Sequence, residues 1–92
     1  MMRTLPDGVE KYAESPLFTE RSAPDKLMSK HNLKAGVWGL LSVSAGRLEY
    51  HMPRSDDQFF VVEEGDQVVI EPTEVHFVTP IGPVEFKVEF YR

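Results

Sequence analysis

Apolar and polar residues alternate along much of the chain from residue 35 onward. In residues 47–52, leucine, tyrosine and methionine alternate with arginine, glutamate and histidine, and residues 85–91 repeat this pattern near the C-terminus. Successive side chains of a strand point to opposite faces of the sheet, so a period of two predicts strands with one apolar face. Residues 37–44 also separate into two faces and predict a third strand.

Shorter runs rich in valine and phenylalanine predict three more strands, at residues 59–62, 68–70 and 75–78. Glycine, proline and aspartate separate the strands. They predict a hairpin at Ala45-Gly46, a loop at 53–57, and turns at 64–66 and 80–83. Strands at this close spacing are typical of an antiparallel sandwich or barrel. A parallel sheet is excluded, because no segment between the strands is long enough for a helical crossover.

The first third of the chain has a different composition. Residues 1–34 contain one valine and three prolines, whereas residues 35–92 contain ten valines and most of the aromatic residues. We interpret residues 1–34 as an arm or short edge elements, with one helical turn near residues 24–28. A chain of 92 residues is too short for two domains. The prediction is one domain over 1–92, with an arm at 1–34 and a β core at 35–92.

Composition and charge exclude several kinds of site and partner. The chain has no cysteine, which excludes disulfides, thiolate metal sites and cysteine nucleophiles. Its net charge is −5, with ten acidic and four basic residues in the β core, so neither a nucleic acid nor an anionic membrane is predicted as a partner. No apolar run is long enough to span a membrane. Residues 1–6 lack the apolar core of a signal peptide, which predicts a cytoplasmic protein.

Histidines are the main candidates for chemistry. His76 begins a predicted strand, His31 precedes the β core, and Glu89 lies in the last strand. Two imidazoles and a carboxylate suit zinc, iron, nickel or manganese with an open coordination position, so we consider a metal site of His31, His76 and Glu89. The alternative is that each histidine is an ordinary packed or surface residue. Alternation places Glu89 on a polar outer face and His51 toward solvent.

The chain resembles two known groups of proteins. Residues 65–76 resemble the second motif of the cupin superfamily, in which a glycine-acid turn, a proline bend and a histidine recur, and residues 38–48 resemble the end of the first motif. More narrowly, four segments resemble the TehB/YeaR-like family of tellurite-resistance-associated domains: residues 5–9, 31–39, 46–50 and 82–92.

This resemblance implies a small cupin-like jelly-roll β-barrel. It places His31 and His76 on histidines of the family pattern and Glu89 on an acidic position. The chain departs from metal-binding cupins because no second histidine follows His31, and Trp38 or Gly39 stands where a glutamate is expected. In tellurite-resistance proteins such a domain can precede an S-adenosylmethionine-dependent methyltransferase. This sequence lacks the glycine-rich strand-turn-helix for that cofactor, so methyltransferase activity is not carried over.

Three functional hypotheses remain open. The first is a binding protein that holds a small molecule, an oxyanion or a divalent metal in the barrel mouth. The second is a metal-dependent oxygenase, isomerase or reductase with His31 and His76 as ligands. The third is a structural or regulatory dimer with a filled barrel. A homodimer is predicted as the assembly, because short β domains gain by covering their edge strands.

Overall fold

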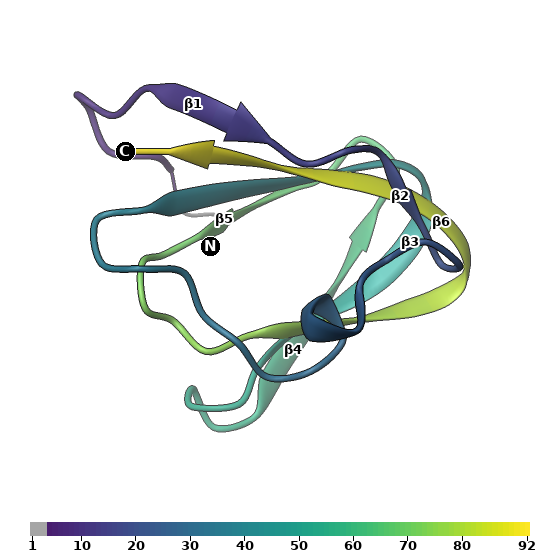
Figure 1. The fold of residues 1–92 in the computed structure, drawn as a ribbon. Helices are drawn as coiled ribbons and strands as arrows, with labels where there is room; N and C mark the ends of the chain where they lie inside the picture. Colours follow the sequence, from purple (N-terminus) through teal and green to yellow (C-terminus); the bar gives the residue numbers. More distant parts are fainter. Residues whose placement is uncertain (1–3) are drawn as a thin grey trace.

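The computed structural model describes residues 4–92, and the described strands form one antiparallel sheet (Figure 1). The elements are β1 Lys11–Glu14, β2 Phe18–Thr19, the 3-10 helix η1 Asp25–Leu27, β3 Trp38–Met52, β4 Gln58–Glu63, β5 Gln67–Ile70 and β6 Phe77–Tyr91. The predicted all-β antiparallel class is confirmed. The helical turn predicted near residues 24–28 is confirmed as η1.

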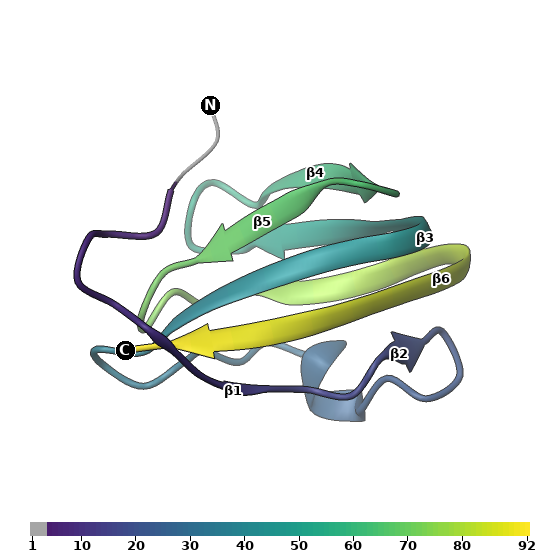
Figure 2. The same ribbon diagram turned by 90° about the horizontal axis from the view of Figure 1, so that it is seen from above.

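The long strands β3 and β6 form the centre of the sheet. They pair antiparallel from Trp38 opposite Tyr91 to His51 opposite Phe77. β4 pairs with the second half of β3 and β5 with its first half, while β1 and β2 pair with β6 on the other side (Figure 2). The path β1-β6-β3-β4 thus has two ends among the described strands. The pairing shows a curved open sheet and does not show the closed barrel.

Both central strands continue through segments where the sequence predicts a turn. The hairpin predicted at Ala45-Gly46 and the turn predicted at residues 80–83 are wrong, because β3 and β6 run through them. The register between the strands instead shifts on either side of Gly46, which has a φ of 72°. Bulges and tight turns favour the same residues. Glycine adopts the left-handed backbone that both require, and proline fits where no N–H has to donate to a neighbouring strand. The local sequence therefore does not distinguish them.

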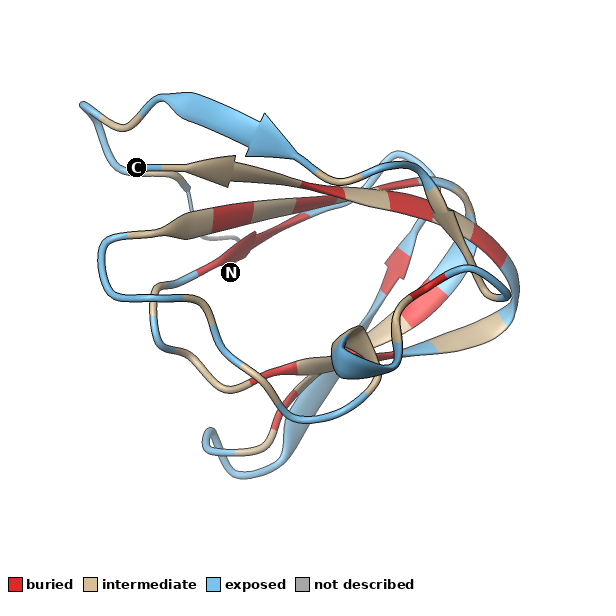
Figure 3. Cartoon of the chain, viewed as in Figure 1, coloured by how far each residue is buried: buried red, intermediate tan, exposed pale blue. Residues whose placement is uncertain are grey.

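The core lies on the concave face of the sheet. Alternate residues of β3 and β6 are buried there, as the red segments of Figure 3 show. The predicted apolar face of residues 48, 50 and 52 is confirmed. The central buried residues are Leu41, Val43, Leu48, Tyr50, Met52, Val62, Val68, Ile70, Val78, Val84, Phe86 and Val88.

Residues 18–33 cover one side of this core. Ala23 is buried in it, and Phe18, Leu27, Met28 and Leu33 pack against it. Glycine at position 39 permits this packing, since a Cβ there would press against Leu33 and Ile70. The N-terminal segment is therefore part of the packed domain, and it forms one wall of the site described below.

The strand predicted at residues 59–62 exists, but its predicted burial is wrong. Only Val62 is buried, whereas Phe59, Phe60 and Val61 are exposed. Phe59 and Val61 pair with His51 and Glu49 on the outer face of the sheet, away from the core. Phe60 lies on the core side, but β4 is the last strand on the sheet path, so no strand of residues 4–92 covers its outer side. An apolar run in the sequence cannot distinguish a central strand from an edge strand.

None of the helices found in residues 4–92 has the length and apolar character needed to span a membrane. The prediction that no signal peptide is present rests on residues 1–6. Residues 1–3 lie outside the described residues.

Candidate functional site

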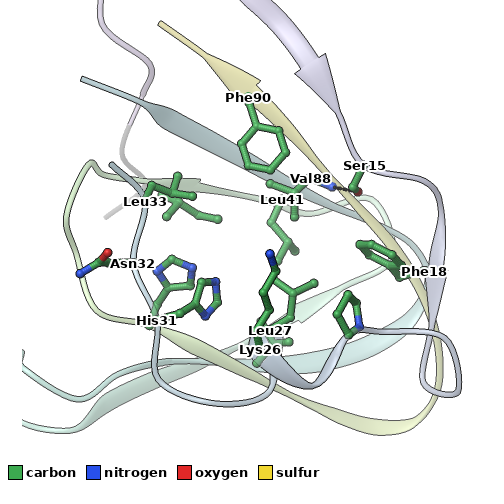
Figure 4. A pocket seen from close by; sticks show the side chains of 14 residues that line it. Ser15, Phe18, Lys26, Leu27, His31, Asn32, Leu33, Leu41, Val88 and Phe90 are labelled. Carbon is green, nitrogen blue, oxygen red and sulfur yellow. Dashed lines mark hydrogen bonds between the residues drawn. The ribbon is translucent and has the colours of Figure 1, made fainter. Parts of the chain in front are cut away.

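A cavity of about 500 Å³ lies between the sheet and the N-terminal segment (Figure 4). Aliphatic and aromatic side chains of β3, β5 and β6 line one wall, and residues 15–33 provide the other. The polar side chains among its lining residues are Ser15, Lys26, His31, Asn32 and His76. No aspartate or glutamate of the described chain lines it. The pocket is thus mainly apolar, with basic groups in its wall.

The structure places His31 and His76 side by side, although they are far apart in the sequence. Their ring centroids are 4.2 Å apart in an edge-to-face arrangement. Their backbones form a reciprocal bridge, in which each N–H donates to the other residue's carbonyl oxygen, at 3.1 and 2.9 Å. This bridge fixes the N-terminal segment to the start of β6. It therefore helps to close the pocket as well as to position both rings.

His76 is a packed residue as well as a pocket residue. It is 2% exposed, and its ring stacks on the Tyr50 ring with centroids 5.5 Å apart. The Tyr50 hydroxyl in turn donates a hydrogen bond to Glu74 Oε1 at 3.3 Å. Burial lowers the pKa of His76 below its ordinary value of 6.5, because a buried imidazolium loses its hydration. His31 also lowers this pKa, whereas the hydrogen bond to the Glu74 carbonyl raises it.

Backbone carbonyls define the tautomer of both histidines. His76 Nδ1 lies 2.9 Å from the Glu74 carbonyl oxygen, and His31 Nδ1 lies 3.0 Å from the Ser29 carbonyl oxygen. A carbonyl oxygen can only accept a hydrogen bond, so Nδ1 carries the proton in each ring. In the neutral rings Nε2 is then the basic nitrogen.

The third residue of the predicted metal site lies elsewhere. Glu89 alternates with the pocket residues Val88 and Phe90 and is not among the lining residues. Its carboxylate lies 2.9 Å from Lys11 Nζ in an ion pair with β1. Within residues 4–92, no cluster of three or more histidine, aspartate or glutamate side chains is placed to hold a metal ion.

His51 is more enclosed than the sequence predicts. Its ring lies between Phe59 and Phe77, with centroid distances of 4.9 and 4.4 Å, and its Nε2 lies 2.9 Å from Glu49 Oε1. The prediction that it points to open solvent is wrong. Because β4 and β6 flank β3 here, cross-strand neighbours cover the ring from both sides.

Several pocket residues are not predicted from the sequence. Lys26, Asn32 and Leu33 fall within the predicted arm and are given no role there. Tyr50, predicted only as part of an apolar face, supports the site by stacking on His76. The predicted helical turn was one available signal, because a short turn with an apolar residue needs a surface to pack against. The sequence could not show which surface that would be.

Comparison with known proteins assigns the chain to a family. The TehB-like domain matches residues 13–88. The chain belongs to the TehB-like domain family. Its relatives include the proteins named "Probable S-adenosyl-L-methionine-dependent methyltransferase TehB" from two Haemophilus influenzae strains, ATCC 51907 / DSM 11121 / KW20 / Rd and 10810. Each is 31% identical over 75 residues, covering 82% of this chain and 22% of the relative.

Solved structures share the fold of this TehB-like domain. A crystal structure of a protein from Escherichia coli strain K12 matches with a TM-score of 0.90 and 23% identity, covering 99% of this chain and 97% of that one. The crystal structure of TehB from Haemophilus influenzae matches with a TM-score of 0.84 and 24% identity. That match covers 92% of this chain and 32% of TehB. At these identities the two structures show the fold alone.

These findings correct the functional predictions. The TehB-like part of the resemblance is confirmed, but the cupin, jelly-roll and metal-binding description is wrong, because the relatives are named as S-adenosylmethionine-dependent methyltransferases. The prediction that the chain binds a small molecule, an oxyanion or a divalent metal is also wrong, because both relatives are named as methyltransferases. The predicted zinc, iron, nickel or manganese is overturned by these names and by the scattered donor groups. The error arose because two imidazoles and a carboxylate, together with a cupin-like histidine motif, were interpreted as metal ligands.

Proposed function

We propose that this chain is an auxiliary domain for S-adenosylmethionine-dependent methylation of the TehB type, with methyl transfer carried out by a separate catalytic domain. One observation supports this most directly. The match to a relative named as a methyltransferase covers 82% of this chain but only 22% of that relative. The remaining part of that protein is large enough to hold the catalytic machinery.

The chemistry of the pocket supports this division of roles. S-Adenosylmethionine carries a sulfonium cation, an ammonium group, a carboxylate and ribose hydroxyls, and acidic side chains commonly bind the ribose in nucleotide cofactor sites. The pocket of the described chain is lined by Lys26 and two histidines but by no carboxylate. Lys26 is exposed and could pair only with the carboxylate of the cofactor, which leaves the sulfonium, the ammonium group and the ribose without an acidic partner. The pocket residues therefore do not fit S-adenosylmethionine.

Domain replacement in Haemophilus influenzae TehB tests the proposal. The TehB-like domain of that protein would be exchanged for this chain and compared with intact TehB and with TehB lacking the domain. Tellurite tolerance of cells is the readout, because the family is associated with tellurite resistance. We expect the chimera to restore most of the tolerance that is lost when the domain is removed.

A binding control keeps this experiment decisive. Each purified protein would be titrated with S-adenosylmethionine, so that a misfolded catalytic domain is recognised directly. A chimera that binds the cofactor as intact TehB does, yet protects cells no better than the protein without the domain, would contradict the proposal. A pocket-filling Leu27→Trp chimera would then locate the contribution, since Leu27 lines the cavity and is only half-buried.

A further inference from the structure

An exposed apolar segment lies at one border of the sheet. Phe59, Phe60 and Val61 of β4 are 53%, 41% and 42% exposed. β4 ends the sheet path, and Figure 2 shows it at the outer border. Soluble proteins usually protect an edge strand with charged residues, proline or a covering segment. This strand instead has three consecutive large apolar residues at its centre.

The backbone N–H and C=O groups of this segment alternate between facing β3 and facing away from it. The Glu64 N–H donates to the Gly46 carbonyl oxygen at 3.0 Å, and the β3–β4 register has no shift from Arg47 opposite Glu63 to Met52 opposite Gln58. Antiparallel residues alternate between facing the partner strand and facing away. The N–H and C=O groups of Phe59 and Val61 therefore face away from β3. The Asp66 carboxylate accepts the next outward N–H, that of Glu63, at 3.1 Å.

Acidic residues stand at both ends of the apolar segment. Asp56 and Asp57 precede β4, and Glu63 and Glu64 close it. Antiparallel pairing of two copies centred on Phe60 would bring Asp56 and Asp57 of one chain near Glu63 and Glu64 of the other. Like charges this close repel one another. This charge pattern disfavours a second copy and favours a segment with basic ends.

We propose that the outer edge of β4 binds an extended segment of a partner protein by strand addition, and that this segment has an apolar centre flanked by lysine or arginine. The outward backbone groups of Phe59 and Val61 supply the main-chain hydrogen bonds. Their side chains, together with Phe60, supply the apolar contact. The acidic ends select the charge of the partner. This proposal does not depend on the methylation role.

A synthetic peptide tests the proposal directly. The probe is a fluorescein-labelled strand of alternating valine and threonine between two pairs of lysines, and the matched control has glutamates in place of the lysines. We expect the lysine peptide to raise the fluorescence anisotropy on titration with the chain and the glutamate peptide to leave it unchanged. Added salt should weaken the interaction, because it screens the exposed charges. Amide chemical shift changes should concentrate in residues 56–64.

Two variants of Val61 separate backbone pairing from side-chain contact. Val61→Pro removes the outward N–H, and a proline is tolerated on an edge strand whose N–H faces solvent. We expect Val61→Pro to weaken binding by about tenfold or more and Val61→Ala by a few-fold, because the proline leaves a partner carbonyl oxygen unpaired in a desolvated contact. The paired variant Asp57→Asn with Glu63→Gln should remove the preference for the lysine peptide.

Further controls keep the result interpretable. Leu17→Ser removes a comparably exposed apolar residue outside β4 and should bind the lysine peptide as the unaltered chain does. A lysine peptide N-methylated along one edge leaves the protein unchanged and should lose affinity. Equal binding of the lysine and glutamate peptides would overturn the proposal. So would shift changes away from β4, or self-association through β4 that excludes the peptide.

Discussion

Replacing Gly46 with alanine is expected to destabilise the domain by more than about 4 kcal/mol, a large effect for a single substitution. Gly46 has a φ of 72°, and a left-handed backbone costs a residue with a side chain about 1 kcal/mol or more. The larger contribution is steric. An added Cβ would overlap the Pro83 carbonyl oxygen, which is backbone and cannot rotate away.

The position of Gly46 explains why this strain would spread. It lies at the register shift between β3 and β6, the two strands that carry most of the core. Relieving the overlap requires the strands to separate at their bend. Since small domains are stable by only about 5–15 kcal/mol, Gly46→Ala should yield little folded protein or a greatly reduced urea midpoint.

Gly65→Ala is the matched control for this substitution. Gly65 has a φ of 88°, but a Cβ there meets nothing within 4 Å. It should therefore cost only about 1 kcal/mol, from the left-handed backbone. Equal losses of unfolding free energy in the two variants would show that the close approach of Pro83 is unimportant.

Replacing His76 with alanine is expected to cost about 2–4 kcal/mol, because it opens a cavity and removes a satisfied buried polar group. A histidine at the rim of a pocket would contribute little to the core, and its loss would leave the fold intact. The 2% exposure and the stacking on Tyr50 now predict the larger loss. Urea denaturation at pH 7.5 measures it. A loss no larger than that of His51→Ala would contradict the assignment of His76 to the core.

The same residue predicts a dependence of stability on pH. The pKa of His76 is lowered in the folded state, so the unfolded chain binds more protons between that lowered pKa and 6.5. Stability should therefore be complete above pH 6.5 and decline as the pH falls through this window. His76→Gln should flatten the decline between pH 7 and 5, above the range in which Glu14 and Glu20 begin to lose their stabilising charge. If the free energy of unfolding changed with pH in the same way in the unaltered chain and in His76→Gln, burial would not lower the pKa of His76.

Much of the fold could be predicted from local pattern. The buried face of residues 48, 50 and 52 follows from alternation, since the opposite face of this segment is polar and only one face packs on the core. The bend at Gly46 could not be distinguished from a hairpin, because both use glycine in the left-handed region. Phe59 is exposed because it pairs with His51 on the outer face of the sheet, and an apolar run does not encode which of its residues face the core.

The candidate site was harder to predict than the fold. No periodicity links His31 to His76, because three strands, β3, β4 and β5, lie between them. The metal site is predicted from the chemistry of two imidazoles and a carboxylate, and the family resemblance only adds to it. Alternation did place Glu89 on the outer face, where it meets Lys11. The two Nδ1 atoms are instead directed at backbone carbonyls.

Titration of the isolated chain with S-adenosylmethionine in a calorimeter tests the central claim most directly. If the chemistry of methyl transfer resides in another domain, the chain should show no saturable heat while intact Haemophilus influenzae TehB does under the same conditions. Saturable binding to the isolated chain, abolished by filling the cavity through Leu27→Trp at a half-buried lining residue, would contradict the account, because this small β domain would then hold the cofactor itself.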